Sequence, residues 1–170
     1  MGPQKESLQS FSNSFQAEFS FMPLQKFDVK LAYRLFDVKT TYGSSLLQKP
    51  LISKDRAFVN LAYEVSGWKF DYTITYSGRK RIPSTIANPL NYQRQSYSPS
   101  FIMMNAQVSK TIGKKNPLEL YAGSENITNY IQKDAIIASG QPFGQYFDAS
   151  LIWGSVTGRM LYAGVRFKRK

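Results

Sequence analysis

Charged side chains are the first place to look for chemistry in this sequence, because it contains neither cysteine nor histidine. Their absence removes thiol catalysis, disulfides, imidazole general bases and the usual zinc and copper ligand sets. A pair of carboxylates could still act as general acid and base. The acids that come closest to such a pair stand instead on the polar side of alternating stretches, beside lysines: Asp28, Glu64, Asp71 and Glu119. This pattern is typical of a surface of mixed charge, so we expect no enzyme, no catalytic residue, no bound metal and no cofactor.

A basic cluster, Arg79-Lys80-Arg81, is the candidate contact for an anion. It lies in a long polar connection and could bind an anionic substrate or the phosphates of lipopolysaccharide, although solvated loop residues are the simpler interpretation. The whole chain is basic, with 22 lysines and arginines against 11 acids and a net charge of +11. A sheet that binds nucleic acid sets aromatic and basic residues on one face, whereas here they fall mostly on opposite faces. We therefore expect no nucleic-acid partner.

Apolar residues recur at every second position through most of the chain, which is the period of a β-strand. In the first such run Phe15 and Phe19 alternate with Gln16 and Glu18, so that one face is apolar and the other polar. Runs of this kind follow one another at 15–21, 27–35, 59–65, 68–76, 104–109, 118–123, 147–153 and 161–168. Residues 1–14 precede them, as an N-terminal loop or a vector-derived segment, and 15–170 form the folded part. The predicted fold class is all-β and antiparallel.

Two properties favour a transmembrane β-barrel over a soluble antiparallel sheet with one face on a core. The polar face carries many charges, and the apolar face is rich in Phe, Tyr and Trp, which form girdles at the two membrane surfaces of such barrels. Phe21, Phe27 and Trp68 would belong to one girdle and Tyr76 to the other. No stretch approaches the roughly 18 apolar residues of a membrane-spanning helix, so any crossing has to be made by strands.

The lengths of the connections give an independent prediction, because outer-membrane barrels have short periplasmic turns and longer extracellular loops. Links at 22–26, 66–67 and 113–117 are short, and those at 39–55, 77–98 and 127–158 are long. In this scheme the run at 147–153 is a hairpin or strand extension inside the last loop, which leaves about seven spanning strands. Single-chain bacterial barrels close with even numbers of strands, from about 8 upward. The chain is therefore predicted to be the last third of a barrel of about 22 strands around a plugged lumen, and its start lacks a secretory signal.

From Trp68 onward the sequence resembles the C-terminal region of TonB-dependent receptors. The resemblance is carried by the stretches WKFDYTITYSGRKRIPST (68–85), YSPSFIMMNAQVSKTIGK (97–114), LYAGSENITNY (120–130), PFGQYFDASLIWGSVTGR (142–159) and MLYAGVRFKRK (160–170). In that family a strand ends in a short motif with glutamate and asparagine before the last extracellular loop. Those positions are held here by Glu125, Asn126, Ile127, Thr128 and Asn129.

The end of the chain is also similar to the assembly signal of this family's last strand. Tyr162, Gly164 and Phe167 match that signal, whereas Arg169 stands where an apolar or aromatic residue is usual. The resemblance implies that these residues form the barrel-terminal strand that the assembly machinery reads.

The resemblance implies TonB-dependent transport of a nutrient ligand across the outer membrane of a Gram-negative cell. Extracellular loops capture the ligand, and the TonB complex acts through an N-terminal plug that this chain would lack. The implied partners are outer-membrane lipid and lipopolysaccharide, the barrel-assembly machinery, and an unidentified small-molecule or oligomeric ligand. Two alternatives stay open. One is a complete eight-stranded barrel with a structural or adhesion role, in which 147–153 spans the membrane; the other is a soluble basic β-sandwich that binds polyanions.

Overall fold

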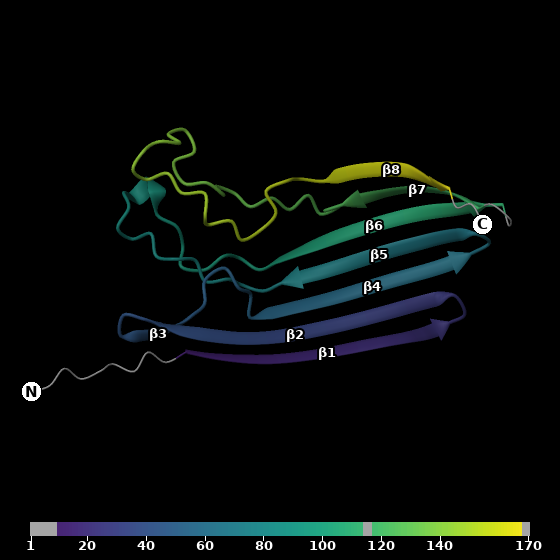
Figure 1. Ribbon diagram of the computed structural model, residues 1–170, viewed down its shortest axis with the longest axis horizontal. Helices are drawn as coiled ribbons and strands as arrows, with labels where there is room; N and C mark the ends of the chain where they lie inside the picture. Colours follow the sequence, from purple (N-terminus) through teal and green to yellow (C-terminus); the bar gives the residue numbers. More distant parts are fainter. Residues whose placement is uncertain (1–9, 114–116, 168–170) are drawn as a thin grey trace, which may run out of the picture.

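The computed structural model describes residues 10–113 and 117–167, which form one antiparallel sheet with a group of loops at one end (Figure 1). The strands follow one another across the sheet in the order β1-β2-β4-β5-β6-β7-β8, and the short β3 pairs with β2. Their bounds are β1 Ser10–Leu24, β2 Phe27–Tyr42, β3 Ser45–Gln48, β4 Asp55–Val65, β5 Trp68–Ser77, β6 Phe101–Ile112, β7 Leu118–Glu125 and β8 Met160–Phe167. One 3-10 helix, η1 Leu90–Tyr92, is the only helical element in this part of the chain. No helix among the described residues is long and apolar enough to cross a membrane.

The strand register keeps the two faces of the sheet distinct from one edge to the other, because directly paired residues of neighbouring strands share a face. One polar row runs across the sheet through Ser20, Lys30, Asn60, Thr73 and Asn105. An apolar row nearer the short turns runs through Phe27, Tyr63, Phe70, Val108, Ala122 and Ala163. A slip by one residue would exchange the faces of a whole strand. The predicted division into an apolar and a polar face is confirmed.

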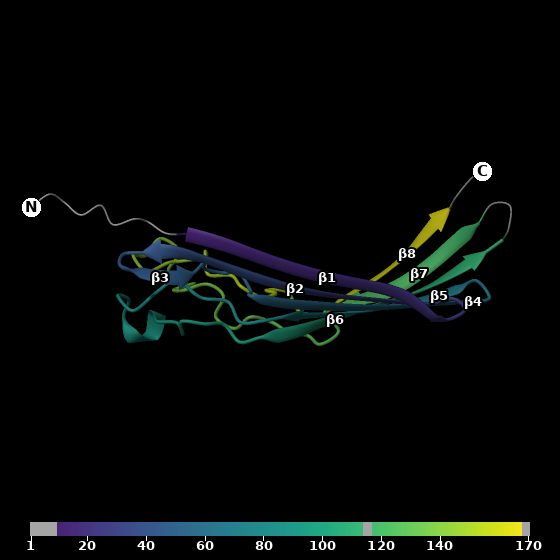
Figure 2. The same ribbon diagram turned by 90° about the horizontal axis from the view of Figure 1, so that it is seen from below.

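No second layer of the described chain covers the apolar face, and Figure 2 shows the sheet nearly edge-on as a single curved layer. Phe19 exposes 66% of its surface and Leu161 exposes 79%. Few hydrophobic residues are buried, and three of them, Ile82, Ile137 and Leu151, lie in the loops and not on the sheet. Burial of apolar surface is the main stabilising term in folding, so the apolar face requires a partner that this part of the chain does not provide.

Two strand boundaries differ from the prediction. β1 begins at Ser10, within the segment predicted as a loop, because Phe11 continues the alternation and pairs with Lys39. The connection after β2 is shorter than predicted, since β2 continues to Tyr42 and turns at Gly43 (φ 60°) into β3. The threonines and tyrosine at this point have high β-propensity, which explains the longer hairpin.

The strand-like run at 147–153 forms no strand. Its only pairing is an isolated bridge between Asp148 and Ile137. Leu151 is buried in the core of the loops and Trp153 packs against it, so the alternation here reflects packing within a loop. The prediction of a hairpin or strand extension is corrected to this single bridge, and the alternative in which 147–153 spans a membrane loses its eighth strand.

Short turns lie at one end of the sheet and long connections at the other, as the alternating lengths predict (Figure 1). β1 and β2 are joined through Lys26, with φ of 65°. β4 and β5 are joined by Ser66 and Gly67, whose φ angles of 48° and 77° suit a tight two-residue hairpin. The third predicted short turn includes residues 114–116, which lie outside the described residues, as does Arg169.

Candidate functional site

Three connections, 49–54, 78–100 and 126–159, fold together at the end of the sheet opposite the short turns (Figure 1). We call this group the loop cap. It has a small core of its own, made of Ile82, Ile137 and Leu151, against which Tyr92 and Trp153 pack. Connections ordered by their own side chains on a rigid scaffold are the usual place for ligand binding. The loop cap is therefore the candidate functional region.

The motif after β7 ties the two ends of the last connection together. Asn126 is 2% exposed and takes the left-handed conformation, with φ of 49°. Its Nδ2 donates to the carbonyl oxygens of Tyr130 at 2.9 Å and Thr157 at 3.1 Å. Its Oδ1 accepts from the Thr128 hydroxyl at 3.1 Å and from the Tyr130 backbone N–H at 2.9 Å. A buried amide with all its groups bonded fixes the chain around it.

Asn129 fastens the same connection at a second point. Its Oδ1 accepts a hydrogen bond from the backbone N–H of Arg159 at 2.9 Å. The Arg159 guanidinium in turn donates to the carbonyl oxygen of Ile127, at 2.7 Å from Nη2 and 3.2 Å from Nε. At Gly158 a Cβ would lie only 2.7 Å from Asn129 Oδ1, so a side chain there would displace the Asn129 amide. Glu125 only ends β7 and is exposed, so the structure assigns the motif an anchoring role that Asn126 and Asn129 carry.

Gln132 is a second buried anchor, which sequence reasoning missed. It is 5% exposed, and its Nε2 donates to the carbonyl oxygen of Leu151 at 3.0 Å. Its Oε1 accepts from the backbone N–H groups of Trp153 at 2.7 Å and Gly154 at 2.9 Å. A single glutamine in a loop has no periodic or motif signal that could have identified it.

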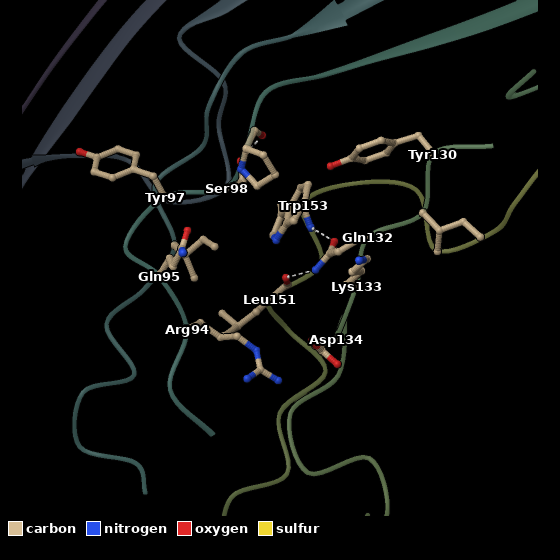
Figure 3. Close-up of a pocket in the computed structure, with 13 residues that line it drawn as sticks. Arg94, Gln95, Tyr97, Ser98, Tyr130, Gln132, Lys133, Asp134, Leu151 and Trp153 are labelled. Carbon is tan, nitrogen blue, oxygen red and sulfur yellow. Dashed lines mark hydrogen bonds between the residues drawn. The ribbon is translucent and has the colours of Figure 1, made fainter. Parts of the chain in front are cut away.

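Open space of about 490 Å³ lies between the second and third connections, and Figure 3 shows the side chains around it. We call it the outer hollow. Its lining includes charges of both signs and aromatic rings, namely Arg94, Lys133, Asp134, Tyr97, Tyr130 and Trp153. The Tyr130 ring stacks on Phe101 with centroids 4.6 Å apart, and burial raises the pKa of the Tyr130 hydroxyl. Small-molecule sites are commonly about 300–1000 Å³, so the outer hollow is large enough for such a ligand.

A second open space of about 540 Å³ lies where the polar face of the sheet meets the loop cap, and we call it the basic hollow. Arg34 of β2 and Arg56 of β4 line it from the sheet, and Lys80 and Trp153 line it from the loops. The Lys80 ammonium donates to the carbonyl oxygen of Trp153. Burial lowers the pKa of Lys80, and the charge of Arg56 lowers it further. Trp153 borders both hollows, so they are neighbours.

The predicted anion contact Arg79-Lys80-Arg81 is not a single site. Consecutive residues of an extended segment point to opposite sides, and the structure separates these three accordingly. Arg79 stands over the Tyr97 ring at 5.3 Å, and Arg81 stands over the Tyr42 ring at 4.6 Å. Of the three, only Lys80 lines the basic hollow. Sequence reasoning missed the two strand arginines there, although their alternation pattern places both on the polar face.

Two tyrosine–glycine pairs join β7 to β8. A Cβ at Gly123 would lie 2.4 Å from the Tyr162 hydroxyl, and one at Gly164 would lie 2.3 Å from the Tyr121 hydroxyl. Each tyrosine is the direct cross-strand partner of the glycine it covers. An aromatic ring over an opposed glycine fixes strand register. Phe167, the third predicted residue of the terminal strand, is 62% exposed on the apolar face.

No three acidic residues in 10–113 and 117–167 lie close enough together to hold a metal ion. No protein-family model matches the chain, and no curated protein matches its sequence.

Proposed function

We propose that the chain forms part of the wall and the ligand-capturing loops of a TonB-dependent receptor, an outer-membrane β-barrel that imports a nutrient ligand. The observation that carries the proposal is one sheet with an uncovered apolar face, a polar face, and a structured loop cap at a single end. A wall between lipid and an aqueous lumen has this division, because its outward positions contact lipid and its inward positions contact water. The loops would then face the outside of the cell.

Strand length supports a membrane crossing. A transmembrane β-strand needs about 9–11 residues. β1, β2, β4, β5 and β6 have 15, 16, 11, 10 and 12 residues. β7 and β8 have 8 each, just below that range. Most of the sheet is therefore long enough to cross a bilayer.

Aromatic residues lie toward both ends of the apolar face, as membrane girdles require. At the turn end Phe27 and Tyr63 meet edge to face, and Trp68 and Phe70 stack, each pair with centroids 6.3 Å apart. At the loop end stands Tyr76, on the same face as Trp68 by its position in β5. The two are separated by about 26 Å along the strand at roughly 3.3 Å per residue.

The edges of the sheet favour a piece of a larger barrel. β1 pairs only with β2, and β8 pairs only with β7, in the part of the chain that the structure describes. Unpaired strand edges are not tolerated in hydrocarbon, so further strands would have to continue the sheet on both sides. A complete small barrel would instead pair β1 with β8, and a sandwich would need a second sheet. Neither contact is present among these residues.

The two tryptophans allow a direct test, because Trp68 lies on the apolar face and Trp153 lies in the loop cap. In brominated-detergent micelles, the Trp68 emission of W153F is expected to be strongly quenched. The Trp153 emission of W68F is expected to change little. Equal quenching of the two, or a folded chain that stays monodisperse without detergent or partner, would contradict the proposal.

A further inference from the structure

The basic hollow brings three cations together from two strands and a loop. Arg34 and Arg56 are direct partners in the β2–β4 register and therefore share one face. Side chains so paired have Cβ atoms about 4.5–5.5 Å apart. Lys80 reaches the same space from the connection after β5, where its backbone forms an isolated β-bridge with Ser53. The register thus places the two arginines on one face, and all three cationic side chains line the same hollow.

No carboxylate in the described part of the chain forms an ion pair with these three cations. The residues that line the basic hollow include no aspartate or glutamate. Asp55, next to Arg56 in sequence, accepts a hydrogen bond from the Tyr33 hydroxyl at 2.6 Å instead. Glu18 of β1 accepts from the Gln16 side chain. Within the described residues the only ion pair is Arg166 with Glu119, which joins β8 to β7 at the opposite edge of the sheet from β2.

Such an arrangement is unfavourable without a ligand. Arg34 and Arg56 stand directly opposite each other, and like charges in such positions destabilise a sheet. The folded chain already disfavours the charged form of Lys80, through burial first and the charge of Arg56 second. An anion placed among the three would remove the repulsion and gain charge-assisted hydrogen bonds, which are bidentate when arginine meets a carboxylate or phosphate.

We propose that the basic hollow binds the carboxylate or phosphate group of a small anionic ligand, held by Arg34, Arg56 and Lys80. The inference deepens the proposed function, because it names the chemical class of the ligand that the loop cap would capture. The hollow is about 540 Å³, which leaves room for a ligand body beside its anionic group. Thr75 and Asn105 add polar groups to its lining, and Phe101 and Trp153 add aromatic surface.

Trp153 reports on this site once the other tryptophan is removed, so the test uses the full chain with W68F, folded in non-ionic detergent. Inorganic phosphate and citrate are titrated at constant ionic strength, and Trp153 emission is followed. A saturable change with at least one of them is expected. R56Q and K80Q should each weaken the apparent affinity about ten-fold or more. K30Q is the matched control, because Lys30 lies on the same face but about 13 Å along β2 from Arg34 at roughly 3.3 Å per residue.

Each outcome decides the inference. A response absent with both probes, or equal in R56Q and K30Q, overturns it, provided that circular dichroism shows the variants folded. Anionic phospholipid added to the micelles should leave Trp153 emission unchanged; a response to lipid alone would assign the site to a headgroup and also overturn it. The quenching of Trp68 is independent of these titrations. The anion site can therefore fail while the membrane assignment stands, and the reverse.

Discussion

Replacing Asn126 with alanine is expected to release the connection 126–159 from the sheet. Four side-chain hydrogen bonds are lost, to Tyr130, Thr157 and Thr128. At about 0.5–1.5 kcal/mol each, with water replacing some of them, the loss is at least about 2 kcal/mol. Alanine at a φ of 49° adds about 1 kcal/mol of backbone strain. A total of about 3 kcal/mol corresponds to an increase of about 100-fold in the population of the open connection.

Trypsin can measure that opening, because Lys133 is the only lysine or arginine between 127 and 158. Cleavage after Lys133 should accelerate about 100-fold in N126A when opening is fast relative to cleavage. N126G keeps the left-handed conformation without strain but lacks the hydrogen bonds, so its acceleration should be smaller, about 30-fold. N91A is the control, because Asn91 is an exposed asparagine of the same loop cap.

Equal cleavage rates in N126A and N91A would show that Asn126 does not hold the connection closed. If N126A is cut faster but N126G is not, backbone conformation holds the connection and the hydrogen bonds do not. Trp153 emission, measured with W68F, gives a second readout that does not depend on the protease. It should shift to the red in N126A as the loop-cap core opens.

Two further predictions concern β7–β8 and Lys80. G164A and G123A should each lower the free energy of unfolding in detergent by about 1–3 kcal/mol, because the new Cβ displaces a tyrosine ring. G140A should be neutral, because no atom lies within 4 Å of a Cβ at that position. Urea titrations would show this, and an equal effect in G140A would contradict it. Because the pKa of Lys80 lies below its usual 10.5, the unfolded chain binds more protons between the two values, and loop-cap stability should rise with pH across that window. Urea midpoints from Trp153 emission, measured with W68F at several pH values, should rise with pH, and K80M added to W68F should remove this rise.

The strands could be predicted from the sequence because their information is local and periodic. Phe15, Phe19 and Phe21 specify one face of β1, and the partners Leu35, Leu31 and Val29 specify the same face of β2. Alternation and short turns together fix the register, which is why the two faces were correct across the whole sheet. The ends of the strands were harder to predict, because the sequence marks the β2–β3 hairpin only by residues of high β-propensity.

The loop cap could not be predicted in the same way. Its anchors, Asn126 and Gln132, act through buried amide groups that also reach Thr157 and Leu151, which are 31 and 19 residues away, and no periodicity marks them. The run at 147–153 alternates like a strand but packs Leu151 into a loop core. A short apolar alternation therefore does not distinguish a strand from a packed loop segment. The separation of the three residues in the basic cluster could have been predicted from the sequence. In an extended chain Lys80 must point away from both of its neighbours.

The basic hollow is lined by strands on one side and by loop-cap connections on the other, and this would link ligand binding to the loop-cap anchors. Arg34 and Arg56 lie on hydrogen-bonded strands, whereas Lys80 and Trp153 belong to connections. The Lys80 ammonium has three donors and uses one on the Trp153 carbonyl, whose backbone N–H is in turn held by Gln132. An anion that binds only the closed arrangement must stabilise it, and by reciprocity a loosened anchor must weaken anion binding. Substitution of Asn126 or Gln132 is therefore expected to lower the affinity for the anion, although neither residue lines the basic hollow.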